Sequence, residues 1–257
     1  MRDIDQTAAP LLDHLVELRK RLIWSFVALF AAFAVCFYFA DRIFAFLAQP
    51  LVAAFPPGEG KLVYTKLYEA FFVEVRVAFF AAFFLAFPVI ANQIWAFVAP
   101  GLYAKEKRAF LPFLIATPVL FLLGGALAYY VVMPTAFHFF LSFEGDLGGI
   151  QQEALPSIGD YLSLVMHFIL AFGIAFLLPV LLMLMERAGL VTRDQLKRGR
   201  RYAILVAFVI AAVATPPDVL SQFMLAVPLI LLYEISLIAI WFTERRRARE
   251  AAGSELL

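Results

Sequence analysis

The chain has 257 residues, of which 64% are hydrophobic and only 16% carry a charge, and its mean hydropathy is +0.88. A soluble domain would be nearer half apolar and a quarter charged, so the composition excludes that class and indicates a polytopic integral membrane protein. The formal net charge of +1 gives no sign of a nucleic-acid partner. The single cysteine, Cys36, can form neither an internal disulfide nor a metal cluster.

Six apolar runs are candidates for membrane-spanning helices, since about 20 apolar residues cross roughly 30 Å of hydrocarbon. In chain order they are Leu22–Ala40, Phe71–Trp95, Phe110–Met133, Ile158–Met185, Tyr202–Ala214 and Val219–Phe242. They predict an all-α fold with six transmembrane helices in one membrane domain, residues 1–242. We expect the remaining residues, 243–257, to form a disordered basic tail. Glycines and prolines in the third and fourth runs predict a bent bundle.

Positive charges alternate along the chain in the way that sets membrane orientation. Seventeen of the 21 Lys and Arg residues lie before the first run, between the second and third, between the fourth and fifth, or after the sixth. Cytoplasmic segments carry such an excess of positive charge. Both termini are therefore predicted to be cytoplasmic.

The fifth run, Tyr202–Ala214, is unusually short, and its 13 residues would reach only about 20 Å as a helix. Pro216 and Pro217 prevent simple continuation, and Thr215 or Asp218 can cap the turn. Asp218 and the following Gln222 would then be polar groups at membrane depth. This pattern favours equally a tight, well-capped hairpin and a site for membrane thinning or partner docking.

Two acids lie in basic surroundings on the predicted cytoplasmic side. Glu17 precedes Arg21 by four residues, the favoured order for an ion pair on a helix, so local pairing and membrane anchoring explain it in part. Glu106, however, lies between Lys105 and Lys107 in another cytoplasmic segment. A carboxylate binds a guanidinium through two parallel hydrogen bonds, which lysine cannot copy. The pair of acids is a candidate site for an arginine-bearing ligand.

Ionisable residues inside the runs are functional candidates by default. Glu234 lies about two turns from the cytoplasmic end of the sixth run, where it could bind a partner helix, pair internally or titrate. Glu74 and Arg76 are adequately explained by snorkelling to the outer interface. His167 has no second ligand at metal-binding spacing, and neither a nucleophile elbow nor a phosphate loop occurs. We therefore predict no catalytic residue, metal or cofactor, and a protein that is not an enzyme.

Four motifs occur in a characteristic order: "HLVELRKRL", "QIWAFVAPGLYAKEKR", "YLSLVMHFILAFGIAFLLPV" and "VATPPDVLSQ". Together they resemble the TatC family, the multispanning receptor subunit of the twin-arginine protein translocase. The similarity covers the chain up to about residue 242. The resemblance implies a protein of the bacterial cytoplasmic (inner) membrane that binds twin-arginine signal peptides. With single-span TatA- and TatB-type partners, such a protein exports folded proteins using the protonmotive force.

The resemblance also implies roles for individual residues and self-association within a larger complex. Glu17 and Glu106 match the two acids that recognise the arginine pair. Arg19, Phe97, Leu102, Tyr103 and Lys105 are expected to line the same patch. Docking of partner helices is expected at Thr215, Asp218, Gln222 and Glu234.

The chain departs from the family pattern in the fourth run. An acidic residue usually precedes the hydrophobic–proline pair there, whereas this chain has Leu177. His167 is not an obvious substitute, because ten helical residues separate the two positions by about 15 Å. No role that needs the acid is carried over.

Two other functions remain open from the residues. A proton- or ion-coupled secondary transporter of a small solute would place a midplane site between broken helices, often within internal repeats, and no repeat is visible. A purely structural subunit of a membrane complex would leave Glu17 and Glu106 without a required ligand.

Overall fold

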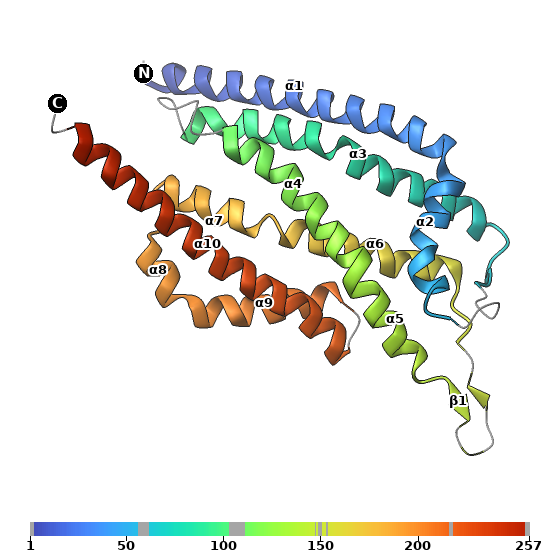
Figure 1. Cartoon of the computed structure of the whole chain (residues 1–257). Coiled ribbons are helices and arrows are strands. Elements are labelled where there is room, and N and C mark those ends of the chain that lie inside the picture. Colours follow the sequence, from blue (N-terminus) through green and yellow to red (C-terminus); the bar gives the residue numbers. More distant parts are fainter. Residues whose placement is uncertain are drawn as a thin grey trace. The chain divides into compact units, whose positions relative to one another are not determined.

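The structure is a computed structural model that describes residues 3–55, 62–102, 111–146, 148, 151–152, 154–215 and 218–254. Its ordered elements are almost all helical (Figure 1). The helices are α1 (Asp3–Tyr38), α2 (Ala40–Val52), α3 (Glu69–Leu102), α4 (Leu111–Leu127), the π-helix η2 (Ala128–Val132), α5 (Met133–Leu141), α6 (Ile158–Ala175), α7 (Leu178–Arg187), α8 (Arg193–Arg198), α9 (Arg200–Ala214) and α10 (Val219–Ser254).

Two short strands complete the described elements. β1 (Gly145–Asp146) pairs antiparallel with β2 (Gln151–Gln152), with Gly145 opposite Gln152. Gly148, in the connection between them, has a φ of 67°, which glycine adopts without steric cost. The prediction of an all-α class is correct apart from this small hairpin.

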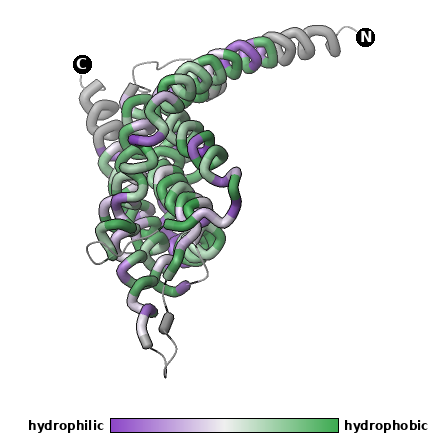
Figure 2. The backbone as a smooth tube through the Cα atoms, turned by 90° about the vertical axis from the view of Figure 1, so that its right-hand side faces the viewer, coloured by the Kyte–Doolittle hydropathy of each residue, from purple (hydrophilic) through white to green (hydrophobic). Residues whose placement is uncertain are grey.

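Five helical segments are long and apolar enough to cross a membrane: His14–Tyr38, Glu69–Phe97, Pro112–Leu141, Ile158–Arg187 and Val219–Arg245. Apolar residues run along these segments, and polar residues gather toward their ends (Figure 2). The chain is therefore an integral membrane protein. α9 has 15 residues and falls short of this length, so the sixth span stays a prediction.

The chain divides into two compact units, which are described separately. Unit 1 comprises Met1–Gln49, Val63–Pro118 and Ser157–Leu162. Unit 2 comprises Pro50–Leu62, Val119–Pro156 and Ser163–Leu257.

Small side chains hold α1 against α3 in unit 1, where the two helices lie side by side (Figure 1). Residues of α1 and the start of α2 meet residues of α3 in one buried cluster, formed by Ala32, Cys36, Ala40, Ala78, Ala82 and Ala86. On each side the members are four residues apart, so they form one stripe along each helix. Small residues allow helix backbones to approach closely, which membrane helices use in place of a hydrophobic driving force.

In unit 1, the carboxylate of Glu69 links the loop before α3 to the start of α6. It accepts hydrogen bonds from the backbone N–H of Thr65 at 2.7 Å and from that of Gly159, at the start of α6, at 2.8 Å. The backbone of Val63 also bridges to Ser157. The loop before α3 is thereby fixed to the first turn of α6.

Unit 2 is built around large buried side chains, among them Phe121, Phe168, Phe172, Met133 and Leu225. α10 packs against α7, α8 and α9. The hydroxyl of Tyr233 on α10 donates to the carbonyl oxygen of Leu196 on α8 at 2.7 Å, which links the two helices.

The regular α-helix is interrupted at two places in unit 2, each beside a proline, while the bent bundle itself stays a prediction. The π-helix η2 is followed directly by α5, whose second residue, Pro134, has no N–H to continue the helical ladder. α6 ends at Ala175 and α7 begins at Leu178, with Pro179 in its first turn. α4 and α6 approach closely at Gly124, because a Cβ there would collide with the backbone carbonyl of Phe172.

Helix boundaries differ from the sequence expectation at both ends of the chain. α1 begins at Asp3, far before the apolar run that starts at Leu22, and α10 continues to Ser254, through the segment expected to be disordered. Arg, Glu, Lys, Leu and Ala are strong helix formers, so the polar extensions propagate the apolar helices. The domain boundary at residue 242 stays a prediction.

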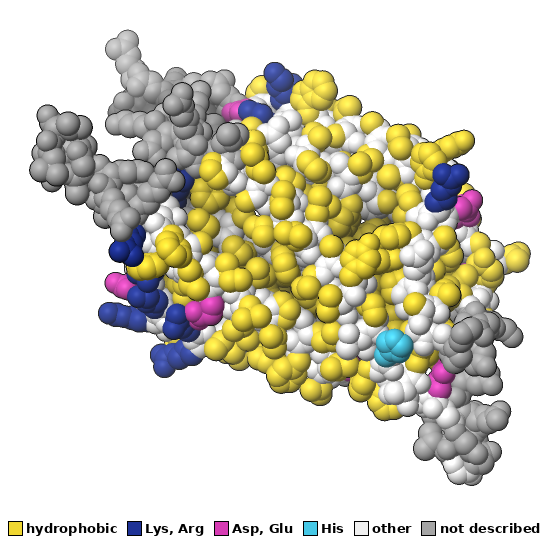
Figure 3. Space-filling view, viewed as in Figure 1, with side chains coloured by type: hydrophobic (Ala, Val, Ile, Leu, Met, Phe, Trp, Pro, Cys, Tyr) yellow, Lys and Arg dark blue, Asp and Glu magenta, His cyan; other side chains and the backbone are white. Residues whose placement is uncertain are grey.

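Charged side chains lie mainly at the ends of the described helices. In unit 2, Lys and Arg side chains gather near α8 (Figure 3). This distribution fits apolar segments surrounded by lipid, with polar ends in the interfacial regions.

Candidate functional site

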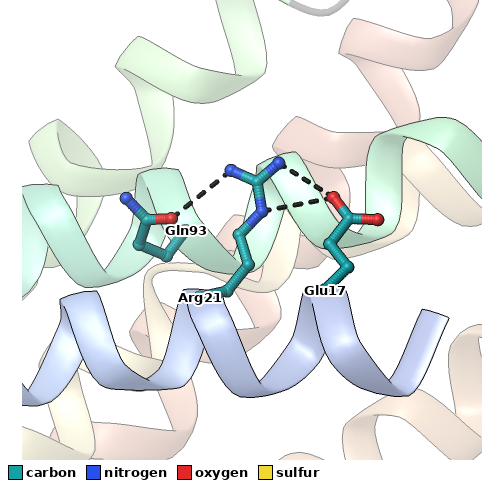
Figure 4. Close-up of polar contacts among 3 residues, drawn as sticks. All are labelled: Glu17, Arg21 and Gln93. Carbon is teal, nitrogen blue, oxygen red and sulfur yellow. Dashed lines mark hydrogen bonds and ion pairs between the residues drawn. The ribbon is translucent and has the colours of Figure 1, made fainter. Parts of the chain in front are cut away.

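The most distinctive polar site in unit 1 is formed by one face of α1 and one face of α3. Glu17 and Arg21 are one helical turn apart on α1, and Gln93 faces them from α3 (Figure 4). Arg21 donates from Nη2 to Glu17 Oε1 at 2.9 Å and from Nε to the same oxygen at 3.3 Å. Its remaining terminal nitrogen, Nη1, donates to Gln93 Oε1 at 3.4 Å. The predicted local ion pair is therefore confirmed.

These three residues border a pocket of about 320 Å³, whose lining also includes Lys20 and Trp24. The side chains of Glu17 and Arg21 retain 35% and 32% of their exposure, so the ion pair is only partly withdrawn from water. All the hydrogen bonds described for the Glu17 carboxylate reach Oε1. The pocket thus combines a carboxylate, an amide and two cationic groups beside an indole ring.

An aromatic contact extends the site by one turn on each helix. The imidazole of His14 stacks on the ring of Phe97, with 4.2 Å between ring centroids and 17° between planes. His14 precedes Glu17 by three residues and Phe97 follows Gln93 by four, so each pair shares a helix face. Phe97, predicted from the resemblance, therefore lies on the same α1–α3 seam as Glu17.

Sequence reasoning missed His14, Trp24 and Gln93 as neighbours of Glu17. Their spacing on α1 and α3 is visible in the sequence, but the register between the two helices is not. The signal that could have found them is the pair of small-residue stripes, which aligns the helices.

The other predicted residues of this patch are only partly described. Arg19 is exposed on α1. Leu102 is the last residue of α3, so Phe97 and Leu102 belong to one helix. Tyr103, Lys105 and Glu106 lie outside the described residues, and the second acid stays a prediction.

The predicted docking residues around the turn between α9 and α10 form a second polar group, in unit 2. Thr215 is buried and donates from Oγ1 to the Ala211 carbonyl at 2.8 Å. Asp218 caps α10, because its Oδ1 accepts from the backbone N–H of Ser221 at 2.7 Å. Gln222 donates from Nε2 to the Phe208 carbonyl of α9 at 3.3 Å. The predicted cap at Asp218 is thus confirmed.

Two atoms at this turn are buried without a hydrogen-bond partner among the described residues, Oδ2 of Asp218 and Oγ of Ser221. A buried polar group that makes no hydrogen bond costs about 1–3 kcal/mol. A donor or acceptor supplied from outside the chain would therefore be stabilised here.

Glu234 does not lie with these three residues. It accepts from Arg200 Nη2 at 2.8 Å, at the opposite end of α9 from Thr215. Twelve residues separate it from Gln222, or about 18 Å along α10. Of the three roles considered for Glu234, internal pairing is confirmed, and partner docking stays a prediction.

The remaining polar candidates have local explanations. The Nδ1 atom of His167 lies 2.6 Å from the Ser163 carbonyl oxygen, four residues earlier on α6. Among the described residues, no three His, Cys, Asp or Glu side chains could hold a metal ion. Leu177 immediately precedes α7 at the bend, where its backbone N–H donates to Ile174 at 3.0 Å.

The fold and the site together define a helical integral membrane protein with a polar, charge-bearing pocket at the end of a closely packed helix pair. Residues 13–228 match the family model described as Sec-independent protein translocase protein (TatC). The chain belongs to the TatC family.

Similar proteins support this assignment over nearly the whole chain. A Sec-independent protein translocase protein TatC from Magnetococcus marinus is 51% identical, over 98% of this chain and 91% of that protein. One from Aquifex aeolicus is 42% identical, over 89% of this chain and 93% of that protein. The crystal structure of a twin-arginine translocase receptor, TatC, in the detergent DDM has 40% identity and a TM-score of 0.77, covering 88% of this chain and 98% of that one.

The family assignment defines the general function of the chain. The chain is a subunit of the Sec-independent protein translocation system, a membrane transport component and not an enzyme. These comparisons do not favour a small-solute transporter.

Proposed function

We propose that this chain is the receptor and core subunit of a twin-arginine translocase. It binds the arginine pair of signal peptides and, with TatA- and TatB-type partners, exports folded proteins across the bacterial cytoplasmic membrane using the protonmotive force. The observation that carries the proposal is the Glu17 carboxylate, which binds a guanidinium group at the border of an accessible pocket. The solved relative described as a twin-arginine translocase receptor supports it.

The chemistry of the pocket favours arginine over lysine in a ligand. Guanidinium is planar and offers several N–H groups to a carboxylate, whereas an ammonium acts as a point charge. A hydrogen bond to a charged group contributes about 1.5–3 kcal/mol when well desolvated. Because Glu17 remains 35% exposed, we expect about 1 kcal/mol from this contact. Glu17 therefore supplies discrimination, and the apolar part of the signal peptide supplies most of the affinity.

The other predicted residues complete the proposed recognition surface. Phe97 stacks on His14 one turn from Glu17, which extends the surface along α1 and α3. Glu106 follows the end of α3 by four residues, and in the proposal it receives the second arginine. Arg19, Leu102, Tyr103 and Lys105 border it.

The proposed topology places six spans in the membrane, with both termini in the cytoplasm. α9 is the short fifth span, since its 15 residues reach about 22 Å. The positive charges in the N-terminal half of α1, around α8 and near the C-terminal end of α10 support this orientation.

In the proposal, partner helices dock beside the turn between α9 and α10. Thr215, Asp218 and Gln222 gather polar atoms there, and Asp218 Oδ2 lacks a partner among the described residues. A polar side chain on a single-span partner would satisfy such an atom, and at membrane depth water is scarce. Self-association within the complex is part of the same proposal.

The test is binding of a fluorescent twin-arginine signal peptide to the protein in lipid nanodiscs, compared with its Lys-Lys twin. We expect preference for Arg-Arg in the unaltered protein and a fivefold to tenfold loss of that preference in Glu17→Gln, about 1–1.4 kcal/mol. The matched control is Asp194→Asn, which removes one negative charge from the exposed face of α8 in unit 2. Equal affinity for both peptides in the unaltered protein, or an unchanged preference in Glu17→Gln, would contradict the proposal.

A further inference from the structure

Arg21 occupies the place on Glu17 that a ligand guanidinium would need. Two of its nitrogens, Nε and Nη2, already donate to Glu17 Oε1. An arginine side chain from outside the chain would offer the same pair of donors to the same carboxylate. A bidentate guanidinium contact uses both oxygens of a carboxylate, so an external arginine would need the Oε1 atom that Arg21 already occupies.

Gln93 helps to retain Arg21 in this position. Its Oε1 accepts from Arg21 Nη1 at 3.4 Å, across the seam between α1 and α3 (Figure 4). The guanidinium is thus held from two helices, with Glu17 on one side and Gln93 on the other. The neighbouring Lys20 lines the same pocket, and the hydrogen bonds described for the Glu17 carboxylate come from Arg21.

The internal pair is weak enough to be displaced. Both partners keep about a third of their exposure, and partly exposed ion pairs one turn apart on a helix stabilise only modestly. The pocket beside the pair, about 320 Å³, gives Arg21 space to move and an incoming side chain a route to Glu17. Molecules in which Arg21 has moved off Glu17 are the open form. A ligand that binds only the open form has an apparent affinity that is lowered in proportion to the fraction of molecules in that form.

We propose that Arg21 is an internal competitor that occupies the guanidinium subsite on Glu17 until an arginine of the bound peptide displaces it. The proposal rests on the proposed function and adds a regulatory element to the same site. Arg21 lowers affinity for all peptides, and it excludes those that cannot supply a guanidinium to take its place. Glu17 is thereby kept paired when no signal peptide is present.

The experiment measures the affinity and association rate of the fluorescent Arg-Arg peptide in nanodiscs for three variants. Arg21→Gln removes the competitor and its charge. Arg21→Lys keeps the charge and removes the planar donor pair. The control, Lys20→Gln, removes one positive charge from the same pocket without touching the bonds to Glu17.

We expect Arg21→Gln to bind the peptide about threefold to tenfold more tightly than the unaltered protein, chiefly through faster association. Arg21→Lys should bind more tightly too, by a smaller factor, because lysine holds the carboxylate less well. Lys20→Gln, which removes only a repelling charge from the pocket, should raise affinity by a smaller factor than Arg21→Gln. Elution of each variant as a monodisperse species from a size-exclusion column verifies folding.

Weaker or unchanged binding in both Arg21 variants would overturn the inference, because a residue that positions Glu17 for the ligand gives the opposite sign. An equal gain in Arg21→Gln and Lys20→Gln would overturn it as well, since net charge alone would then be the cause. Failure of the proposed function gives a different result from failure of the inference about Arg21. In that case the unaltered protein shows no Arg-Arg preference, and Glu17→Gln has no effect on it.

Discussion

Replacing Ala32 with leucine tests whether the small-residue seam between α1 and α3 determines the geometry of the pocket. Ala32 is 8% exposed and packs in a cluster with three members on α3, of which Ala78 and Ala82 are fully buried. Leucine adds three carbon atoms to this nearly buried position. Overpacking of this kind costs about 1–3 kcal/mol. The neighbouring Ala31 is exposed on the same helix, so Ala31→Leu provides a matched control with the same change in composition.

The assay is the thermal midpoint for loss of the monodisperse species in detergent, followed by peptide binding at low temperature. A destabilisation of 1–3 kcal/mol corresponds to a drop of about 2–12 °C for a domain of this size. We expect that drop for Ala32→Leu, and a change of about 1 °C or less for Ala31→Leu, which faces lipid. Peptide affinity should rise with Ala32→Leu, because wider helix separation moves Gln93 away from Arg21 and so loosens the internal competitor on Glu17. Equal midpoints for the two variants would refute the reasoning.

Two further predictions concern unit 2 and use the same thermal assay. Gly124→Ala should lower the midpoint, because the new Cβ meets the backbone carbonyl of Phe172. Gly148→Ala should lower it less, because the new Cβ has no atom within 4 Å and only the positive φ opposes the substitution. An equal effect of the two would contradict the close approach at Gly124. Asp218→Ala should cost about 1 kcal/mol through loss of the cap on α10, and Asp218→Asn should retain most of that stability. A loss as large in Asn as in Ala would show that Asp218 does not act as a cap.

The fold was predictable to the extent that it depends on continuous apolar runs. Five of the six runs correspond to segments long enough to span a membrane, and the bends at Pro134 and Pro179 follow from the missing proline N–H. Helix ends were less predictable. Polar residues such as those before Leu22 form helix as readily as apolar ones, so hydropathy marks the membrane portion of α1 and not its length.

The site was predictable only along a single helix. Glu17 and Arg21 are neighbours because α-helical geometry brings residues four apart together, and the sequence contains that spacing. Gln93 lies 72 residues after Arg21, and its contact depends on how α3 is aligned with α1. That alignment follows from alanines spaced by four on both helices, a pattern that hydropathy does not distinguish from other apolar sequence.

Leu177 connects the bend in unit 2 with the proposed docking of partners. The bend does not need an acid at this position, because Pro179 interrupts the helical ladder and the Leu177 N–H donates three residues back to Ile174. A leucine here leaves the middle of the α6–α7 segment apolar, so a partner helix would find no carboxylate at that point. α9 and α10 instead offer polar atoms at their connecting turn, around Asp218, and at the pair of Glu234 with Arg200. In the proposed complex, polar recognition of partners by unit 2 therefore falls on the turn between α9 and α10, where Asp218 Oδ2 lacks a described donor, and not on the junction of α6 with α7.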